Sequence, residues 1–273
     1  MDNKSYRKVP KGNKKDKYKD KYKDKDKNKD KIQDKNRKET VNKEDNRIPP
    51  RHPVWNVWQG LFLLLIIYGI EFFLGWLRTP KDLDQLEGFF RFLTVGMGEA
   101  LLYLIIILCF FKLIRRPLRE LGLVRPHVRY ILLGLMMGVF LLVVVGLIGN
   151  FLANKLGTPA PQSFTLVLMG AQYDWQLMLL IILGGMIAPI KEEVFFRGIF
   201  YPPFRQGYGR GKGILFTAGL FALLHFDVLR FIPLLVGGVV LTWLYEKTGS
   251  LWPSIIAHGT WNTLMALMVW IQR

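Results

Sequence analysis

Long apolar runs separated by short polar connectors make up the chain from residue 54 to its end. A helix needs about 20 consecutive, mostly apolar residues to cross the hydrocarbon core of a bilayer. The runs predict seven transmembrane helices, at residues 54–77, 89–113, 130–153, 175–200, 214–226, 231–245 and 251–271. A shorter apolar stretch at 163–170 is expected to be a re-entrant or interfacial piece. This pattern predicts an all-α fold, a polytopic membrane helix bundle of about seven to eight transmembrane helices.

The first 50 residues show no apolar periodicity and alternate lysine with aspartate. They contain too little hydrophobic surface to offset the entropy lost on ordering the chain, so we expect a disordered arm. This segment has 19 basic and 10 acidic side chains, which gives it +9 of the formal net charge of +17. Such an arm is expected to interact with anionic lipid at the membrane surface, and a nucleic-acid partner is not expected.

Basic residues gather in alternate connectors between the apolar runs. The N-terminal arm, the connector after residues 89–113 and the connector after residues 175–200 are basic, whereas the connectors between them are not. Cytoplasmic loops of membrane proteins carry an excess of lysine and arginine, so the N-terminus is expected in the cytoplasm and the C-terminus outside. The compact chain and its lysine-rich arm favour a bacterial cell membrane as the location.

Two glutamates and an arginine stand near the end of the apolar run at 175–200. A charged side chain in hydrocarbon costs roughly 2.5–3.5 kcal/mol on the mildest scales, so its presence indicates a function. Glu193 and Arg197 are four residues apart, share one helix face and can form an ion pair. Glu192 is turned about 100° away from Glu193 and remains available for chemistry. Glu99, in an earlier run, is expected to pair with another helix or to be buried neutral.

Two further polar clusters interrupt the later apolar runs, one at His225 and one at His258 with Asn262. His258 and Asn262 are four residues apart, so both can act from one helix face as hydrogen-bond donors. Counted from the cytoplasmic ends of their helices at 1.5 Å per residue, Glu192, His225 and His258 lie roughly 10–17 Å deep. The three helices therefore place polar groups in one layer, which predicts a shared site.

These residue types suit the hydrolysis of an amide by water. A carboxylate beside a histidine can hold and deprotonate water, so Glu192 and His225 are candidates for this role. His258 and Asn262 are candidates for stabilising the oxyanion that develops on the attacked carbonyl. No Gly-x-Ser-x-Gly motif occurs, and the single cysteine, Cys109, is far in sequence from any histidine, which argues against a covalent nucleophile.

Three other interpretations remain open. Glu192, His225 and His258 form a plausible ligand set for zinc, although the His-Glu-x-x-His motif of zinc proteases is absent. A proton-coupled transporter would also place glutamate and histidine inside the membrane, but it should show internal repeats, which this sequence lacks. A non-catalytic membrane protein that binds a peptide partner would keep the fold and tolerate the loss of Glu192.

The order Glu-Glu-x-x-x-Arg, Phe-x-x-x-His and His-x-x-x-Asn in separate helices resembles the CAAX protease and bacteriocin-processing (CPBP) family of intramembrane endopeptidases. This family is related to the type II CAAX prenyl endopeptidases. The resemblance covers about residues 117–268 and includes the stretch at 249–258 before the last apolar run. It implies an α-helical fold whose active cavity opens toward the cytoplasm.

The resemblance also implies roles for individual residues. Glu192 and His225 would activate water, His258 and Asn262 would bind the oxyanion, and Glu193 and Arg197 would be positioning residues. The expected organisation is an arm at 1–50, two N-terminal transmembrane helices at 54–116 and an intramembrane protease core at 117–273. The expected function is intramembrane proteolysis of a peptide or protein substrate without a cofactor. The alternatives are a zinc-dependent protease using the same residues and a non-catalytic bacteriocin-immunity or binding protein.

Overall fold

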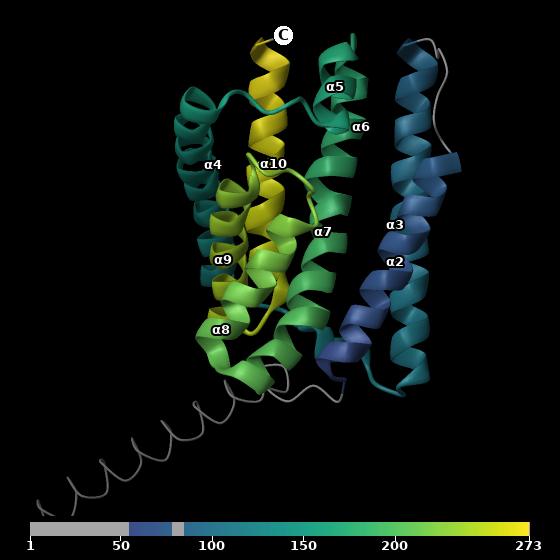
Figure 1. The fold of residues 1–273 in the computed structure, drawn as a ribbon, viewed down its shortest axis with the longest axis vertical. Coiled ribbons are helices and arrows are strands. Elements are labelled where there is room, and N and C mark those ends of the chain that lie inside the picture. Colours follow the sequence, from purple (N-terminus) through teal and green to yellow (C-terminus); the bar gives the residue numbers. More distant parts are fainter. Residues whose placement is uncertain (1–54, 78–84, 273) are drawn as a thin grey trace, which may run out of the picture. The chain divides into compact units, whose positions relative to one another are not determined.

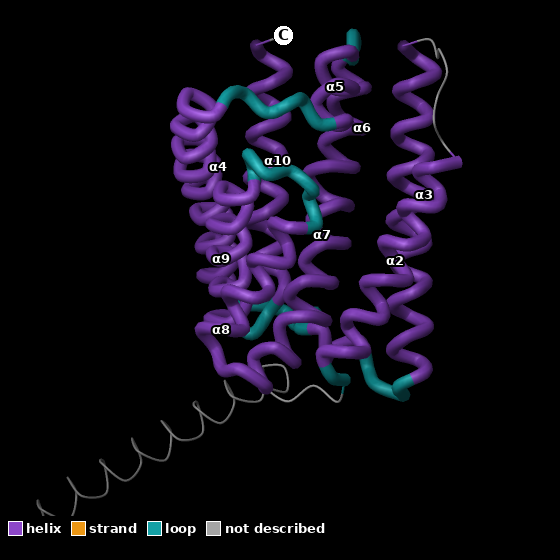
Figure 2. The backbone as a smooth tube through the Cα atoms, in the orientation of Figure 1, coloured by secondary structure: helices purple, strands orange, loops and turns teal. Residues whose placement is uncertain are grey.

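The computed structural model describes residues 55–77 and 85–272, and within these ranges every regular element is a helix (Figures 1 and 2). The arm predicted at 1–50 lies outside the described residues. The elements before the glutamate pair are α2 (Val57–Leu77), α3 (Gln85–Leu113), η1 (Leu118–Leu121), α4 (Val128–Leu156), α5 (Ser163–Gly170), α6 (Asp174–Leu180) and η2 (Ile181–Ile187). The remaining elements are α7 (Ala188–Glu193), η3 (Val194–Phe200), α8 (Tyr201–Leu223), α9 (Phe231–Thr248) and α10 (Leu251–Gln272).

The predicted all-α membrane bundle is confirmed, and each predicted span coincides with a helical segment. In the described part of the chain, four helices are long and apolar enough to cross a membrane, namely α3, α4, α9 and α10. Helix α2 contributes a shorter apolar stretch at Val57–Ile70. The run at 175–200 forms an unbroken helical path through α6, η2, α7 and η3, in which η2 and η3 are π-helical. The short stretch at 163–170 is helix α5.

Helix α8 bends sharply at Gly209, whose φ of 81° and ψ of 170° are not helical. A positive φ is strained for residues with a Cβ atom, so glycine suits this bend. The arm of α8 before the bend is tied to the C-terminal end of α9, because Arg205 donates from Nε and Nη2 to Glu246 at 2.7 and 2.8 Å. The Tyr201 hydroxyl donates to the same carboxylate at 2.8 Å. The second half of α8 therefore runs back beside α9 and carries residues 221–223 toward the middle of the bundle (Figure 1).

A cluster of buried aromatic side chains joins η3 to the N-terminal helices. Phe195 packs edge-on against Tyr103 of α3, with ring centroids 5.7 Å apart. Trp55 is 2% exposed, packs on Phe111, and donates from Nε1 to the Ile199 carbonyl at 2.8 Å. The indole N–H of Trp55 is therefore satisfied by a carbonyl inside the bundle, without water.

Helix α10 approaches η2 so closely that glycine is required on both sides. A Cβ atom at Gly259 would lie 2.5 Å from the carbonyl oxygen of Gly185. A Cβ atom at Gly185 would lie 2.3 Å from the hydroxyl oxygen of Thr263. Small residues allow helix backbones in membrane proteins to pack closely, which gains dispersion energy. This contact sets the distance between α10, which carries His258 and Asn262, and the segment that leads to Glu192.

Candidate active site

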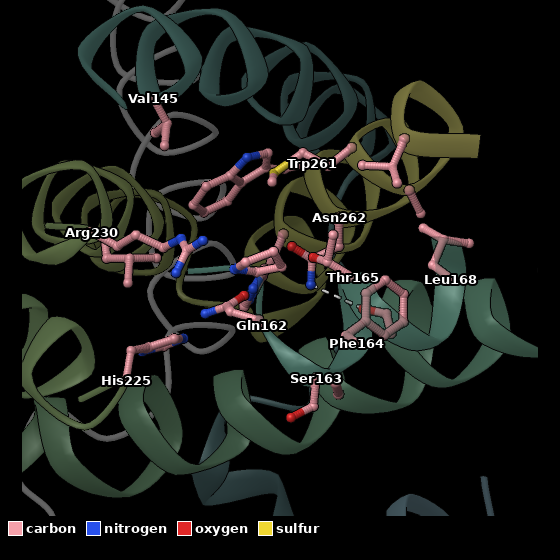
Figure 3. Close-up of a pocket in the computed structure, with 18 of the residues that line it drawn as sticks. Val145, Gln162, Ser163, Phe164, Thr165, Leu168, His225, Arg230, Trp261 and Asn262 are labelled. Carbon is pink, nitrogen blue, oxygen red and sulfur yellow. Dashed lines mark hydrogen bonds between the residues drawn. The ribbon is translucent and has the colours of Figure 1, made fainter. Parts of the chain in front are cut away.

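A cavity of about 1210 Å³ lies inside the helix bundle, and Figure 3 shows part of its lining. Its walls come from segments spread over most of the described chain, including α3, α4, α5, η2, α9 and α10. The lining is mostly apolar, with a small number of polar side chains, as is usual for ligand-binding cavities. The four residues named from the sequence as catalytic candidates all line it, and these are Glu192, His225, His258 and Asn262.

Glu193 and Arg197 form the ion pair that their spacing predicts. Arg197 Nη1 lies 2.9 Å from Glu193 Oε1, and both side chains are fully buried. Arg197 also donates from Nη2 to the Gly238 carbonyl at 3.1 Å and from Nε to the Thr242 hydroxyl at 3.2 Å. A buried ion pair is tolerated only when further hydrogen bonds satisfy its polar atoms. Arg197 therefore anchors the Glu193 carboxylate to helix α9.

His258 stands between the two glutamates. Its Nδ1 atom lies 2.8 Å from Glu193 Oε1, and its Nε2 atom lies 3.9 Å from Glu192 Oε2. A carboxylate accepts hydrogen bonds, so the short contact assigns a proton to Nδ1 and leaves the Nε2 lone pair toward Glu192 in the neutral ring. Glu193 thereby fixes both the tautomer and the orientation of this imidazole.

Asn262 is held by a different protein group from His258, and its expected action with His258 on a substrate oxyanion stays a prediction. Its Nδ2 atom donates to the Gly184 carbonyl at 3.0 Å, whereas His258 is held by Glu193. The amide has a second N–H, because Nδ2 carries two hydrogens. Gly184 belongs to η2, the π-helical segment that directly precedes α7. The Asn262 side chain is therefore held by a backbone carbonyl a few residues before the two glutamates.

His225 and Glu192 line the same cavity, but no ion pair or hydrogen bond joins these two described residues. The histidine nearest to the Glu192 carboxylate is His258, and the expected activation of water by Glu192 with His225 stays a prediction. His225 Nδ1 lies 2.7 Å from the Phe221 carbonyl, which only a protonated Nδ1 can satisfy. The Nε2 atom of His225 thus keeps a lone pair that can accept a hydrogen bond. Phe221 explains the Phe-x-x-x-His spacing, since its backbone accepts from the histidine one turn later.

Glu192 is the least satisfied acidic group of the site. Its side chain is 25% exposed, and its Oε2 atom is buried without a hydrogen-bond partner among the described residues. Buried polar atoms are nearly always hydrogen-bonded, and exceptions often mark reactive groups. Glu193 Oε2 also lacks a hydrogen-bond partner among the described residues, but the Glu193 side chain is fully buried and its Oε1 atom is bound by Arg197 and His258. The structure thus separates one glutamate held by protein groups from another that is open to a ligand.

The ligand set of the zinc interpretation is not assembled in this structure. Within residues 55–77 and 85–272, no three histidine, cysteine, aspartate or glutamate side chains are arranged to hold a metal ion. In each histidine Nδ1 is held by a protein acceptor, Glu193 for His258 and the Phe221 carbonyl for His225, so Nε2 is the nitrogen that remains for a ligand. The expectation that no cofactor is needed remains a prediction.

Two further residues of the cavity lining make contacts that the sequence spacing does not predict. The Phe221 ring lies 4.8 Å from the Arg197 guanidinium and 4.7 Å from the His225 ring. Arg230 lines the cavity and pairs with Asp227 in the loop after α8. The only sequence signal for Arg230 is an aspartate three residues before an arginine at the start of an apolar run, which is common at helix ends.

Comparisons with known proteins point to one family. Residues 174–264 match the model of the family described as type II CAAX prenyl endopeptidase Rce1-like. The Bacillus subtilis (strain 168) protein named "Putative membrane peptidase YdiL" is 28% identical over 90 residues, which cover 33% of this chain and 37% of that protein. The UPF0177 protein YaiF of Lactococcus lactis subsp. lactis (strain IL1403) is 34% identical over 85 residues, 30% of this chain and 36% of that protein.

The matched segments span little more than a third of the length of these curated relatives. No solved structure matches the chain. The family match contains Glu192, His225, His258 and Asn262, the four cavity residues described above. The resemblance expected from the sequence is confirmed over residues 174–264, which are similar to the Rce1-like type II CAAX prenyl endopeptidase family.

Proposed function

We propose that the protein is an intramembrane endopeptidase that hydrolyses a peptide bond with a water molecule activated by Glu192. The observation that supports this most directly is the buried, unpartnered Oε2 atom of Glu192, 3.9 Å from a histidine Nε2, in a cavity large enough for a peptide segment. The family match and the resemblance to a protein named as a membrane peptidase support the same reaction class.

In the first step, water in the cavity gives a proton to the Glu192 carboxylate while its oxygen attacks the carbonyl carbon of the scissile bond. His225 orients this water through its free Nε2 lone pair. The proton on Glu192 can pass to His258 Nε2, which lies 3.9 Å from Glu192 Oε2. The negative charge of Glu193, held by Arg197, stabilises the resulting imidazolium.

The carbonyl oxygen becomes an oxyanion in the tetrahedral intermediate. The second N–H of Asn262 is the donor assigned to it, since the first is used by the Gly184 carbonyl. Collapse of the intermediate breaks the C–N bond, and the proton held by His258 or Glu192 moves to the leaving nitrogen. The products are a new carboxyl terminus and a new amine, and the glutamate returns to its ionised form. No step requires a covalent enzyme intermediate or a metal.

The test is cleavage of a fluorogenic peptide by the full-length protein in lipid nanodiscs. Glu192→Gln keeps the shape of the side chain and removes its basicity, so turnover should fall by about 10²–10⁴. The matched control is Glu99→Gln, the same change on another helix that lines the cavity, which should retain most of the turnover. Near-normal turnover of a correctly folded Glu192→Gln protein would contradict the proposal.

A further inference from the structure

Arg230 projects from the end of a loop into the cavity that holds the candidate catalytic residues. It is the N-cap residue of α9, it lines the cavity together with Glu192 and His258, and its side chain is 26% exposed. Figure 3 shows its guanidinium directed inward among the lining side chains. Of the lysine and arginine side chains in the described lining, the other is Lys191, which directly precedes Glu192 in the chain.

Two fixed partners hold the guanidinium of Arg230 in place. Its Nη2 atom donates to the Ala160 carbonyl at 2.9 Å, and its Nη1 atom pairs with the Asp227 carboxylate. Asp227 is itself fixed, because it accepts from the Arg230 backbone N–H at 3.0 Å. The segment around Ala160 also lines the cavity, through Pro159, Pro161 and Gln162. A guanidinium has five N–H donors, so these two side-chain contacts leave donors for a further ligand.

We propose that Arg230 is a subsite that binds a carboxylate of the peptide substrate, an inference that rests on the proposed endopeptidase function. The planar fork of arginine matches a carboxylate with two parallel hydrogen bonds, and it is always charged. Asp227 already demonstrates that the fork accepts a carboxylate in this position. In a peptide, the ligand is either the C-terminal carboxylate or the side chain of aspartate or glutamate.

Asp227 acts in this arrangement as an internal competitor. Partial burial raises the pKa of Asp227, but hydrogen bonds from the backbone and side chain of Arg230 outweigh this and leave the pKa below its usual value. The carboxylate therefore stays charged at neutral pH and occupies part of the fork. Removing its charge should free Arg230 for the substrate, whereas removing Arg230 should abolish the subsite. If the Arg230–Asp227 pair only stabilised the loop, removing either side chain would shift peptide binding in the same direction.

The experiment measures binding, so that it does not depend on turnover. The probes are fluorescein-labelled octapeptide pools of neutral residues, prepared as the free acid, as the C-terminal amide, and as the amide with one internal glutamate. Fluorescence anisotropy is recorded with the full-length Glu192→Gln protein in nanodiscs. The carboxylate-bearing pools should bind roughly 10- to 100-fold tighter than the neutral amide, because hydrogen bonds to charged groups are the strong ones. Tighter binding of the free acid would show that Arg230 binds the C-terminal carboxylate. Tighter binding of the glutamate-containing amide would show that it binds a side-chain carboxylate.

In the Glu192→Gln protein, a further Arg230→Gln substitution should abolish the preference for carboxylate-bearing peptides. Arg230→Lys should retain only part of this preference, and Asp227→Asn should increase it. Equal binding of all three pools, no binding of any pool, or equal weakening of every pool by both Arg230→Gln and Asp227→Asn would overturn the proposal. The Glu192→Gln protein could prefer carboxylate-bearing peptides while the protein without this substitution cleaves no peptide. That result would support the subsite and refute only the endopeptidase function.

Discussion

The two adjacent glutamates differ because their surroundings differ. Glu193 is fully buried and its Oε1 atom is bound by Arg197 and His258, whereas Glu192 is 25% exposed and has no hydrogen bond to another described residue. Consecutive helical residues point about 100° apart, so one turn of helix can present one carboxylate to the protein and the other to a ligand. At this scale His258 is the link between them, with one ring nitrogen directed to each carboxylate.

Glu193→Gln tests this link. The amide oxygen can still accept from His258 Nδ1, but the charge that would stabilise an imidazolium is lost. We expect kcat to fall by at least about tenfold with little change in KM, since neutralising the analogous carboxylate of a serine-protease triad costs about 10⁴. The melting temperature should also fall, because Arg197 loses its counter-charge in a buried site. An unchanged kcat in a protein with a lowered melting temperature would show that Glu193 serves stability alone.

At the scale of elements, the contact between α10 and η2 sets the geometry of the site. The backbones meet where Gly259 faces the Gly185 carbonyl, one residue after His258 and three before Asn262. The Asn262 side chain donates to the adjacent Gly184 carbonyl. A shift of α10 away from η2 would therefore break this hydrogen bond and move His258 relative to Glu192 at the same time.

Gly259→Ala should reduce both thermal stability and turnover. The added methyl carbon would lie 2.5 Å from a backbone oxygen, so one of the two segments must move. The matched control is Gly219→Ala on α8, where an added Cβ atom meets nothing within 4 Å and where alanine favours the helix. Differential scanning fluorimetry and the peptide-cleavage assay would compare the two variants. If Gly259→Ala behaves like Gly219→Ala, the close approach does not set the site.

Much of this arrangement follows from local patterns in the sequence. The spacing of Glu193 and Arg197 predicts their ion pair, and the apolar runs predict the helices that the structure contains. The pairing of His258 with Glu193 does not follow from such a pattern, because it depends on the rotation of α10 about its axis. The hydrogen bond from Trp55 to the Ile199 carbonyl cannot be predicted from local spacing either, because the two residues are 144 positions apart in sequence.

At the scale of the whole molecule, helices from both halves of the described chain enclose one cavity. Helix α3 contributes Glu99 and Gly96, while α4, α9 and α10 form much of the remaining wall. The buried aromatic cluster of η3 joins the N-terminal helices to the segment matched by the family model. A peptide entering this cavity would meet Arg230 at the loop after α8 and Glu192 on α7, two groups of opposite charge.

A cofactor-free site predicts that chelation leaves turnover intact. Protein purified in nanodiscs would be treated with a strong zinc chelator, assayed, and analysed for bound metal. We expect unchanged cleavage and no stoichiometric zinc, because no three histidine, cysteine, aspartate or glutamate side chains among the described residues are arranged to hold a metal ion. Loss of activity on chelation, with recovery on adding zinc, would restore the zinc interpretation of Glu192, His225 and His258.

Single-turnover cleavage in H₂¹⁸O tests the activation of water by Glu192 most directly. Excess full-length protein in nanodiscs is mixed with a fluorogenic peptide, and the products and the intact protein are analysed by mass spectrometry. The mechanism predicts one ¹⁸O atom in the new carboxyl terminus, no increase in protein mass at any time, and a rate reduced by about 10²–10⁴ in Glu192→Gln. A protein adduct during turnover, or labelled product formed at an undiminished rate by Glu192→Gln, would contradict it.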